Sequence, residues 1–167
     1  VEVEATKKVE LKNNIVWGNF AGENSDEQIS LTSFGTSNQS HVSLEYNNVE
    51  GGKDKVDIGE DSRLEWGKGN ISADPQFEDP GSWNDNGTPA NLDDDYWESG
   101  SYWLTANSPS VDTGEDQPET VVGKLDVANF KRVVGPIDMG AFENEKYPLK
   151  INKFTVKAGK SIVPRLD

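Results

Sequence analysis

Cysteine is absent from the 167 residues, and histidine and methionine occur once each. Without cysteine the chain forms no disulfide, no thiolate nucleophile and no zinc or iron–sulfur site of the cysteine type. No apolar run approaches the length of about 20 residues that a transmembrane helix needs. The single histidine, His41, lies among Ser37–Ser40 with no motif around it. This setting predicts that His41 is a solvated or turn histidine rather than the base of a Ser/His/Asp triad or a zinc ligand.

Basic residues are also few: 16 lysines and arginines stand against 30 acidic residues, for a net charge of −14. A chain of this charge lacks the basic face that nucleic acids or anionic membranes require, so neither is an expected partner. The only methionine is Met139, and the last residues form no obvious terminator. We therefore expect a fragment or processed piece, with any signal peptide or anchor outside it.

Alternation of apolar and polar residues is the recurring pattern, and it predicts short β-strands and an all-β fold. The alternating runs are Val1–Ala5, Val9–Leu11, Val42–Tyr46, Val56–Ile58 and Leu64–Trp66. Asparagines recur after three of them, at Asn14, Asn48 and Asn70, with irregular spacing. Stacked asparagines at the corners of a solenoid would explain this repeat. Turn asparagines of a β-sandwich explain it equally well.

Residues 79–101 are polar, acidic and rich in glycine and proline, which predicts a long surface loop. Part of the loop, beginning at Ser82, follows a degraded calcium-loop template, with Gly87 at the sixth position. The candidate calcium ligands are Asn84, Asn86, Asp93 and Asp95. A solvated acidic loop without a metal is the alternative.

Aromatic residues are concentrated between positions 83 and 103. Exposed aromatic faces stack on sugar rings, so Trp83, Tyr96 and Trp97 are candidate carbohydrate-binding residues. The alternative is structural, with Tyr102, Leu104 and one or two tryptophans closing the end of an apolar core.

Residues 74–143 contain an ordered series of motifs. Asp74-Pro75-Gln76-Phe77, Tyr102-Trp103-Leu104 and Ser108-Pro109-Ser110-Val111-Asp112-Thr113-Gly114 resemble a "DPLF … YRL … SPAIDAG" series. Asp126–Arg132 and Ile137-Asp138-Met139-Gly140-Ala141-Phe142-Glu143 resemble its "DxxGxxR … VDMGAYE" ending, with Asn129 in place of the glycine. These motifs are typical of the C-terminal end of right-handed parallel β-helix proteins of the pectin-lyase-like type, labelled choice-of-anchor Q. The resemblance covers roughly residues 9–143.

The resemblance implies terminal coils of a right-handed parallel β-helix in residues 1–78, an acidic loop and C-terminal cap in 79–145, and the start of a further β module or tail in 146–167. It also implies export to a bacterial cell surface or the medium. It assigns structural roles to Asp74, Asp112, Asp126, Arg132, Asp138 and Glu143. We expect Arg132 to pair with Asp126 or Asp138.

Three functions remain open. The first is a non-catalytic end of a surface β-helix that binds polysaccharide. The second is a fragment of a polysaccharide lyase or glycoside hydrolase whose active site lies in upstream coils. The third is a spacer or adhesin stalk. An open edge at the first strands would pair with upstream coils or with another copy of the chain.

Overall fold

The computed structural model describes residues 8–19, 27–32 and 40–144 of the chain. Within these residues the fold is mainly β, built from short strands. The helical elements there are single turns: η1 (Gly52–Lys55), η2 (Leu92–Asp94) and α1 (Glu119–Val122). The expected strand Val1–Ala5 and the expected β module after residue 145 lie outside the described residues.

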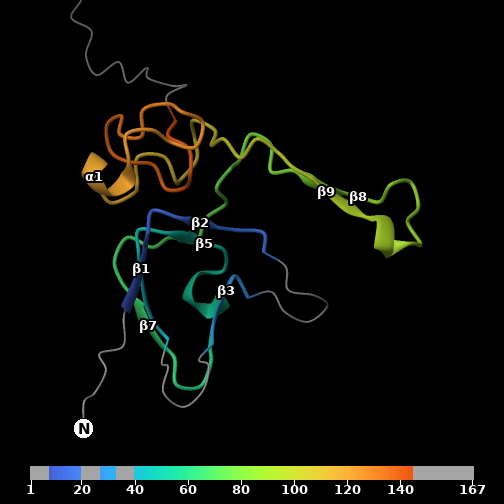
Figure 1. Cartoon of the computed structure of the whole chain (residues 1–167), viewed down its shortest axis with the longest axis horizontal. Helices are drawn as coiled ribbons and strands as arrows, with labels where there is room; N and C mark the ends of the chain where they lie inside the picture. Colours follow the sequence, from blue (N-terminus) through green and yellow to red (C-terminus); the bar gives the residue numbers. More distant parts are fainter. Residues whose placement is uncertain (1–7, 20–26, 33–39, 145–167) are drawn as a thin grey trace, which may run out of the picture.

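Seven of the strands form three parallel sheets (Figure 1). The first sheet has the order β1 (Lys8–Lys12), β4 (His41–Glu45) and β7 (Arg63–Trp66). The second pairs β2 (Ile15–Val16) with β5 (Asn48–Val49), and the third pairs β3 (Ile29–Leu31) with β6 (Val56–Ile58). The alternating runs from residue 9 onward all overlap these strands, so their prediction is confirmed.

The three sheets share one apolar interior. Its buried residues are Leu31, Val42, Leu44, Val49 and Val56. Equivalent positions of neighbouring strands stack on one another, as in the row of Leu11, Leu44 and Trp66 across the first sheet. Because side chains alternate along each strand, every second residue of β4 and β7 enters this interior, together with Leu11 of β1.

A left-handed residue followed by an asparagine forms the corner between the first and second sheets. Asn13, Tyr46 and Gly69 have φ values of 59°, 53° and 73°. Asn13 and Tyr46 adopt this φ with a side chain, but position 69 requires glycine because a Cβ there would collide with the Tyr46 ring.

The asparagines that follow, Asn14, Asn47 and Asn70, form a ladder. Asn47 Oδ1 accepts the backbone N–H of Asn14 at 3.0 Å, and Asn70 Oδ1 accepts that of Asn47 at 3.0 Å. The sequence repeat matched Asn48 to Asn14 and Asn70, and this assignment was wrong by one residue. Asn48 lies one position further along and pairs with Ile15 and Ile71. The NN dipeptide offers two candidates, and sequence spacing does not select between them.

Residues 104–144, here called the closing segment, pack on the outer face of the β2–β5 sheet. Val16 and Val49 fill the interior, so their neighbours Ile15 and Asn48 point outward. Asn48 Nδ2 donates to Ser110 Oγ at 3.0 Å, and the N–H of Gly140 donates to the carbonyl of Asn13 at 2.8 Å. Figure 1 shows the closing segment directly beside β2 and β5.

Candidate functional site

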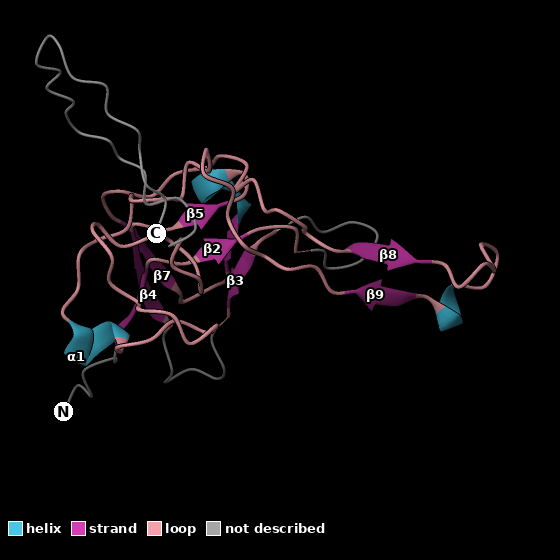
Figure 2. Ribbon diagram, turned by 90° about the horizontal axis from the view of Figure 1, so that it is seen from above, coloured by secondary structure: helices cyan, strands magenta, loops and turns pink. Residues whose placement is uncertain are grey.

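The acidic loop predicted at 79–101 contains an antiparallel hairpin. Strands β8 (Ser82–Asn84) and β9 (Tyr96–Glu98) pair so that Trp83 lies opposite Trp97. Figures 1 and 2 show the hairpin projecting away from the three parallel sheets. Short strands joined by a polar tip give the sequence the composition of a loop, which is why the hairpin escaped prediction.

The two tryptophans form one face of the hairpin. Their ring centroids are 5.7 Å apart with an interplanar angle of 77°. Trp83 is 69% exposed and Trp97 is 43% exposed, so each presents a large apolar surface to solvent. A pair of aromatic rings left this open marks a contact surface rather than a core.

Tyr96 belongs to the opposite face, because neighbouring residues of a strand point to opposite sides. It is 45% exposed, and its hydroxyl lies 3.4 Å from Glu98 Oε1, which also accepts Asn84 Nδ2 at 2.9 Å. The structure thus brings together two of the three predicted carbohydrate-binding residues, and places the third with polar side chains behind them.

Ring contacts continue from the hairpin into the body of the molecule. The Trp97 indole N–H donates to the Tyr102 hydroxyl at 2.9 Å, and the Tyr102 ring meets Phe77 edge-on at 5.7 Å. Both Phe77 and Tyr102 line a cavity of about 270 Å³ between the base of the hairpin, β2 and the closing segment. Its other walls include Ile15, Trp17, Leu104 and Met139.

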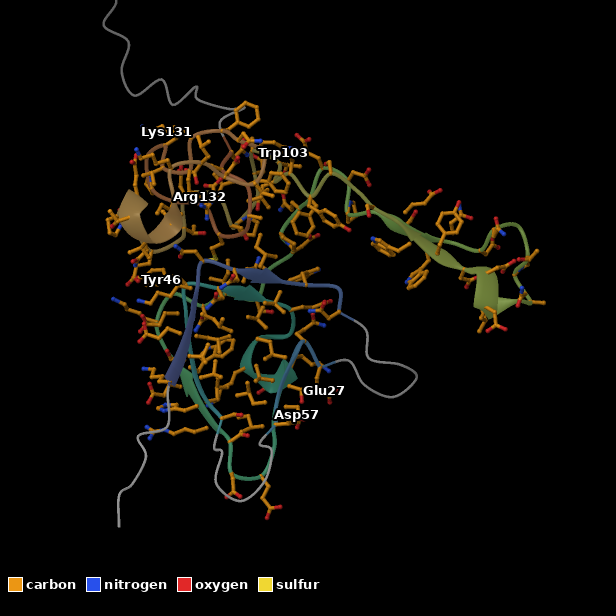
Figure 3. All side chains as sticks on the ribbon, viewed as in Figure 1. Glu27, Tyr46, Asp57, Trp103, Lys131 and Arg132 are labelled. Atoms are coloured by element: carbon orange, nitrogen blue, oxygen red, sulfur yellow. The ribbon has the colours of Figure 1, made fainter. Side chains whose placement is uncertain are left out.

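Trp103 faces a different set of rings. It contacts Phe142 at 4.6 Å and Phe130 at 5.8 Å between centroids, and Figure 3 shows it where the closing segment meets the hairpin. Leu104 is buried in the same region. Of the aromatic cluster predicted from sequence, Tyr102 and Trp103 therefore anchor the hairpin, while Trp83 and Trp97 remain open.

Several oxygens of the candidate calcium loop hold the tip of the hairpin, whereas Asp95 Oδ1 is buried without a hydrogen-bond partner in the described part of the chain. Asn84 Oδ1 accepts the N–H of Asn86 at 2.8 Å. The Thr88 hydroxyl donates to Asp94 at 2.8 Å and holds the pKa of that carboxyl below its usual value. Among the described residues no three acidic or histidine side chains are grouped as metal ligands, Asp93 and Asp95 included. Calcium binding stays a prediction. Calorimetric titration of calcium into chelator-treated protein tests it.

Arg132 is buried within the closing segment (Figure 3), where it pairs with Glu143. The guanidinium lies 3.4 Å from Glu143 Oε2 and donates to the carbonyl oxygens of Asp138 and Gly140 at 3.2 and 2.9 Å. The expected partners were Asp126 or Asp138, and neither carboxylate receives it. Both carboxylates are occupied by backbone N–H groups instead, which sequence motifs do not reveal.

Those backbone contacts explain the acidic positions of the motifs. Asp126 accepts the N–H groups of Ala128, Phe130 and Glu143, and Asp138 accepts those of Asp112 and Asn144. Asp74 closes a turn by accepting the N–H of Gln76 at 2.8 Å. A carboxylate takes such roles because it accepts several N–H groups at once. The structure places these residues in turns that their carboxylates hold.

Burial raises the pKa of Glu143 to about 7, and the nearby Asp138 carboxylate acts in the same direction. The backbone N–H of Val134 and the Arg132 guanidinium oppose that shift. Burial also raises the pKa of Asp138. The closing segment thus depends on two buried carboxylates, and that of Glu143 changes its charge near neutral pH.

His41 lies in β4 and contacts Glu65 on the outer face of the first sheet. Its Nε2 is 3.0 Å from Glu65 Oε1, which Arg63 also contacts at 3.0 Å, and Lys8 reaches the second oxygen at 2.6 Å. The Lys8 ammonium lowers the pKa of Glu65. A carboxylate contacted by side chains from three neighbouring strands ties the sheet together.

Comparison with protein-family models, with curated proteins and with solved structures gives no match for this chain. No helix among the described residues is long and apolar enough to cross a membrane. The candidate site therefore stands on its own geometry: an exposed tryptophan pair that continues through Tyr102 into an apolar cavity.

Proposed function

We propose that this chain is the closing end of an exported bacterial parallel β-helix of the pectin-lyase-like, choice-of-anchor Q type, and that it acts at the cell surface without catalysis. Three features support the β-helix: parallel pairing in all three sheets, a shared interior and the asparagine ladder. Parallel strands need long connections, and a chain that passes each sheet in turn supplies them.

The closing segment fits this role because it bridges successive corners. Asn13 exchanges hydrogen bonds with the backbone of Glu115 at 2.7 and 2.9 Å, and Asn48 contacts Ser110 one strand further on. Lys12 adds an ion pair to the Glu115 carboxylate at 2.6 Å. The segment thereby fastens β5 and the corner between β1 and β2 from the outside.

The activity we assign to this end is contact with a neutral polysaccharide. The observation that carries it is the paired, solvent-exposed tryptophans Trp83 and Trp97 on a hairpin that extends from the body. A pyranose ring has an apolar C–H face that stacks on an indole, while its hydroxyls stay in water. Aspartates at 79, 85, 93, 94 and 95 make the hairpin acidic, and this charge opposes binding of a uronate polymer.

Affinity electrophoresis through gels that contain neutral or uronate-rich polysaccharides tests the assignment. We expect the protein to be retarded by at least one neutral polymer, and Trp83→Ala or Trp97→Ala to abolish the retardation. Leu92→Ala is the matched control, because Leu92 is an exposed apolar residue on the same hairpin without a ring. Equal retardation of all variants would contradict the assignment. A chain that no polymer retards would favour the spacer role.

A further inference from the structure

The cavity at the base of the hairpin continues the tryptophan surface. Trp83 contacts Trp97, Trp97 donates to the Tyr102 hydroxyl, and the Tyr102 ring is part of the cavity wall. A ligand that lies along the two indoles therefore meets the cavity next.

The cavity has room for one ring. Its volume of about 270 Å³ is near the lower end of the roughly 300–1,000 Å³ typical of ligand pockets. The walls come from three separate parts of the chain: Ile15 and Trp17 from β2 and its end, Phe77 and Tyr102 from the hairpin base, and Met139 from the closing segment. A ring held here would touch all three.

The side chains that line the cavity are aliphatic or aromatic, and among them the Tyr102 hydroxyl and the Trp17 indole N–H are the polar groups. An ordinary hexose is hydroxylated at nearly every carbon, and each hydroxyl buried without a partner loses its hydrogen bonds to water. A methyl group in the same place would bury apolar surface against Leu104 and Met139 and gain free energy. The Tyr102 hydroxyl accepts the Trp97 N–H, so its own proton remains to be donated to one ligand oxygen.

We infer that this cavity binds a 6-deoxy sugar ring at the end of a neutral glycan whose next rings lie on Trp97 and Trp83. The inference rests on the proposed polysaccharide contact. It names the sugar at the end of the glycan that lies in the cavity. The described residues that form the cavity wall include no charged side chain, which agrees with a neutral ligand.

Matched pairs of monosaccharides that differ only at carbon 6 test this: L-fucose with L-galactose, L-rhamnose with L-mannose, and 6-deoxy-D-glucose with D-glucose. Trp17 and the other indoles report binding through tryptophan fluorescence. We expect the deoxy member of at least one pair to bind about tenfold more tightly than its hydroxylated partner. Equal affinities within all three pairs would overturn the inference.

Two variants separate the cavity from the tryptophan surface. Ala141→Leu adds volume at the exposed rim of the cavity, and we expect it to abolish the deoxy preference while gel retardation by the polysaccharide persists in weakened form. Trp83→Ala should abolish gel retardation while the preference for deoxy monosaccharides persists. An Ala141→Leu protein with the full deoxy preference would overturn the cavity assignment alone. If the proposed function itself is wrong, no polysaccharide will retard the wild-type protein.

Discussion

At the scale of single residues, Asn47 is the most heavily used side chain of the ladder. Its Oδ1 accepts from Asn14, and its Nδ2 donates to the carbonyls of Leu11 and Glu45 and to Asn70 Oδ1, all within 3.1 Å. It is fully buried, so no water replaces these partners. The repeat of asparagines was visible in the sequence, but both Asn47 and Asn48 are buried, and which of the two joins the ladder depends on the left-handed corner before it.

Asn47→Ala should lower the free energy of unfolding by about 2–4 kcal/mol, because it leaves several buried polar groups without partners. Asn86→Ala is the control, since Asn86 is exposed at the hairpin tip. Urea unfolding followed by circular dichroism measures both. Similar midpoints for the two variants would show that the ladder contributes little.

Glu143 gives the closing segment a pH dependence of definite sign. Its pKa in the folded chain is about 7, above the ordinary value of 4.5, so the folded state holds the proton more tightly. The stabilisation is complete below about pH 4.5 and is lost as the pH rises through about 7. Glu65, Glu115 and Asp94 have lowered pKa values and act in the opposite sense, in the acidic range.

We expect the melting temperature to fall between pH 5.5 and pH 8, and Glu143→Gln to flatten that fall. Calorimetry at four pH values measures it, with Glu98→Gln on the exposed hairpin as the matched control. A wild-type melting temperature that rises over this interval would contradict the assignment.

At the scale of elements, the hairpin depends on two glycines at its base. A Cβ at Gly100 would collide with the carbonyl of Asp79 and the backbone N–H of Gly81, so the two chain segments cross where neither has a side chain. The sequence shows these glycines only as loop composition. The crossing, like the pairing of Trp83 with Trp97, depends on contacts between positions on opposite sides of the hairpin tip, which local composition does not reveal.

Gly100→Ala should separate the base of the hairpin and leave the parallel sheets folded. Limited proteolysis is the measurement, and we expect faster cleavage within residues 82–98 with an unchanged far-ultraviolet spectrum. Gly87→Ala is a useful comparison, because nothing lies near a Cβ at position 87, although its φ of 72° adds local strain. Slow, wild-type cleavage of the Gly100 variant would show that the base tolerates a side chain.

At the scale of the molecule, each parallel sheet ends in the strand that comes first in the chain. β1, β2 and β3 each form one edge of their sheet, and Val9 on β1 is 52% exposed although the positions aligned with it are apolar. Unpaired backbone groups at a sheet edge favour pairing with another strand. Strand positions and the mainly-β class followed from alternation in the sequence, whereas the parallel pairing depends on contacts between distant parts of the chain that alternation does not encode.

The isolated chain should therefore associate through this edge, with a light-scattering mass that rises with concentration. Val9→Lys places a charge at the edge and should reduce the association. Val121→Lys is the control, because Val121 is also an exposed valine but lies on α1, away from the sheet edge. A strictly monomeric mass at all concentrations would contradict this expectation.

The corners that join the first and second sheets stack on one another independently of the chain between them. Successive ladder asparagines are separated by connections of unequal length, yet the hydrogen bonds that stack them have the same length of 3.0 Å. The chain between corners can thus be lengthened or shortened without disturbing the stack. Proteins built this way would diverge in repeat length while keeping their shape. A left-handed residue followed by asparagine, and not a fixed period, is then the pattern by which further such turns can be found.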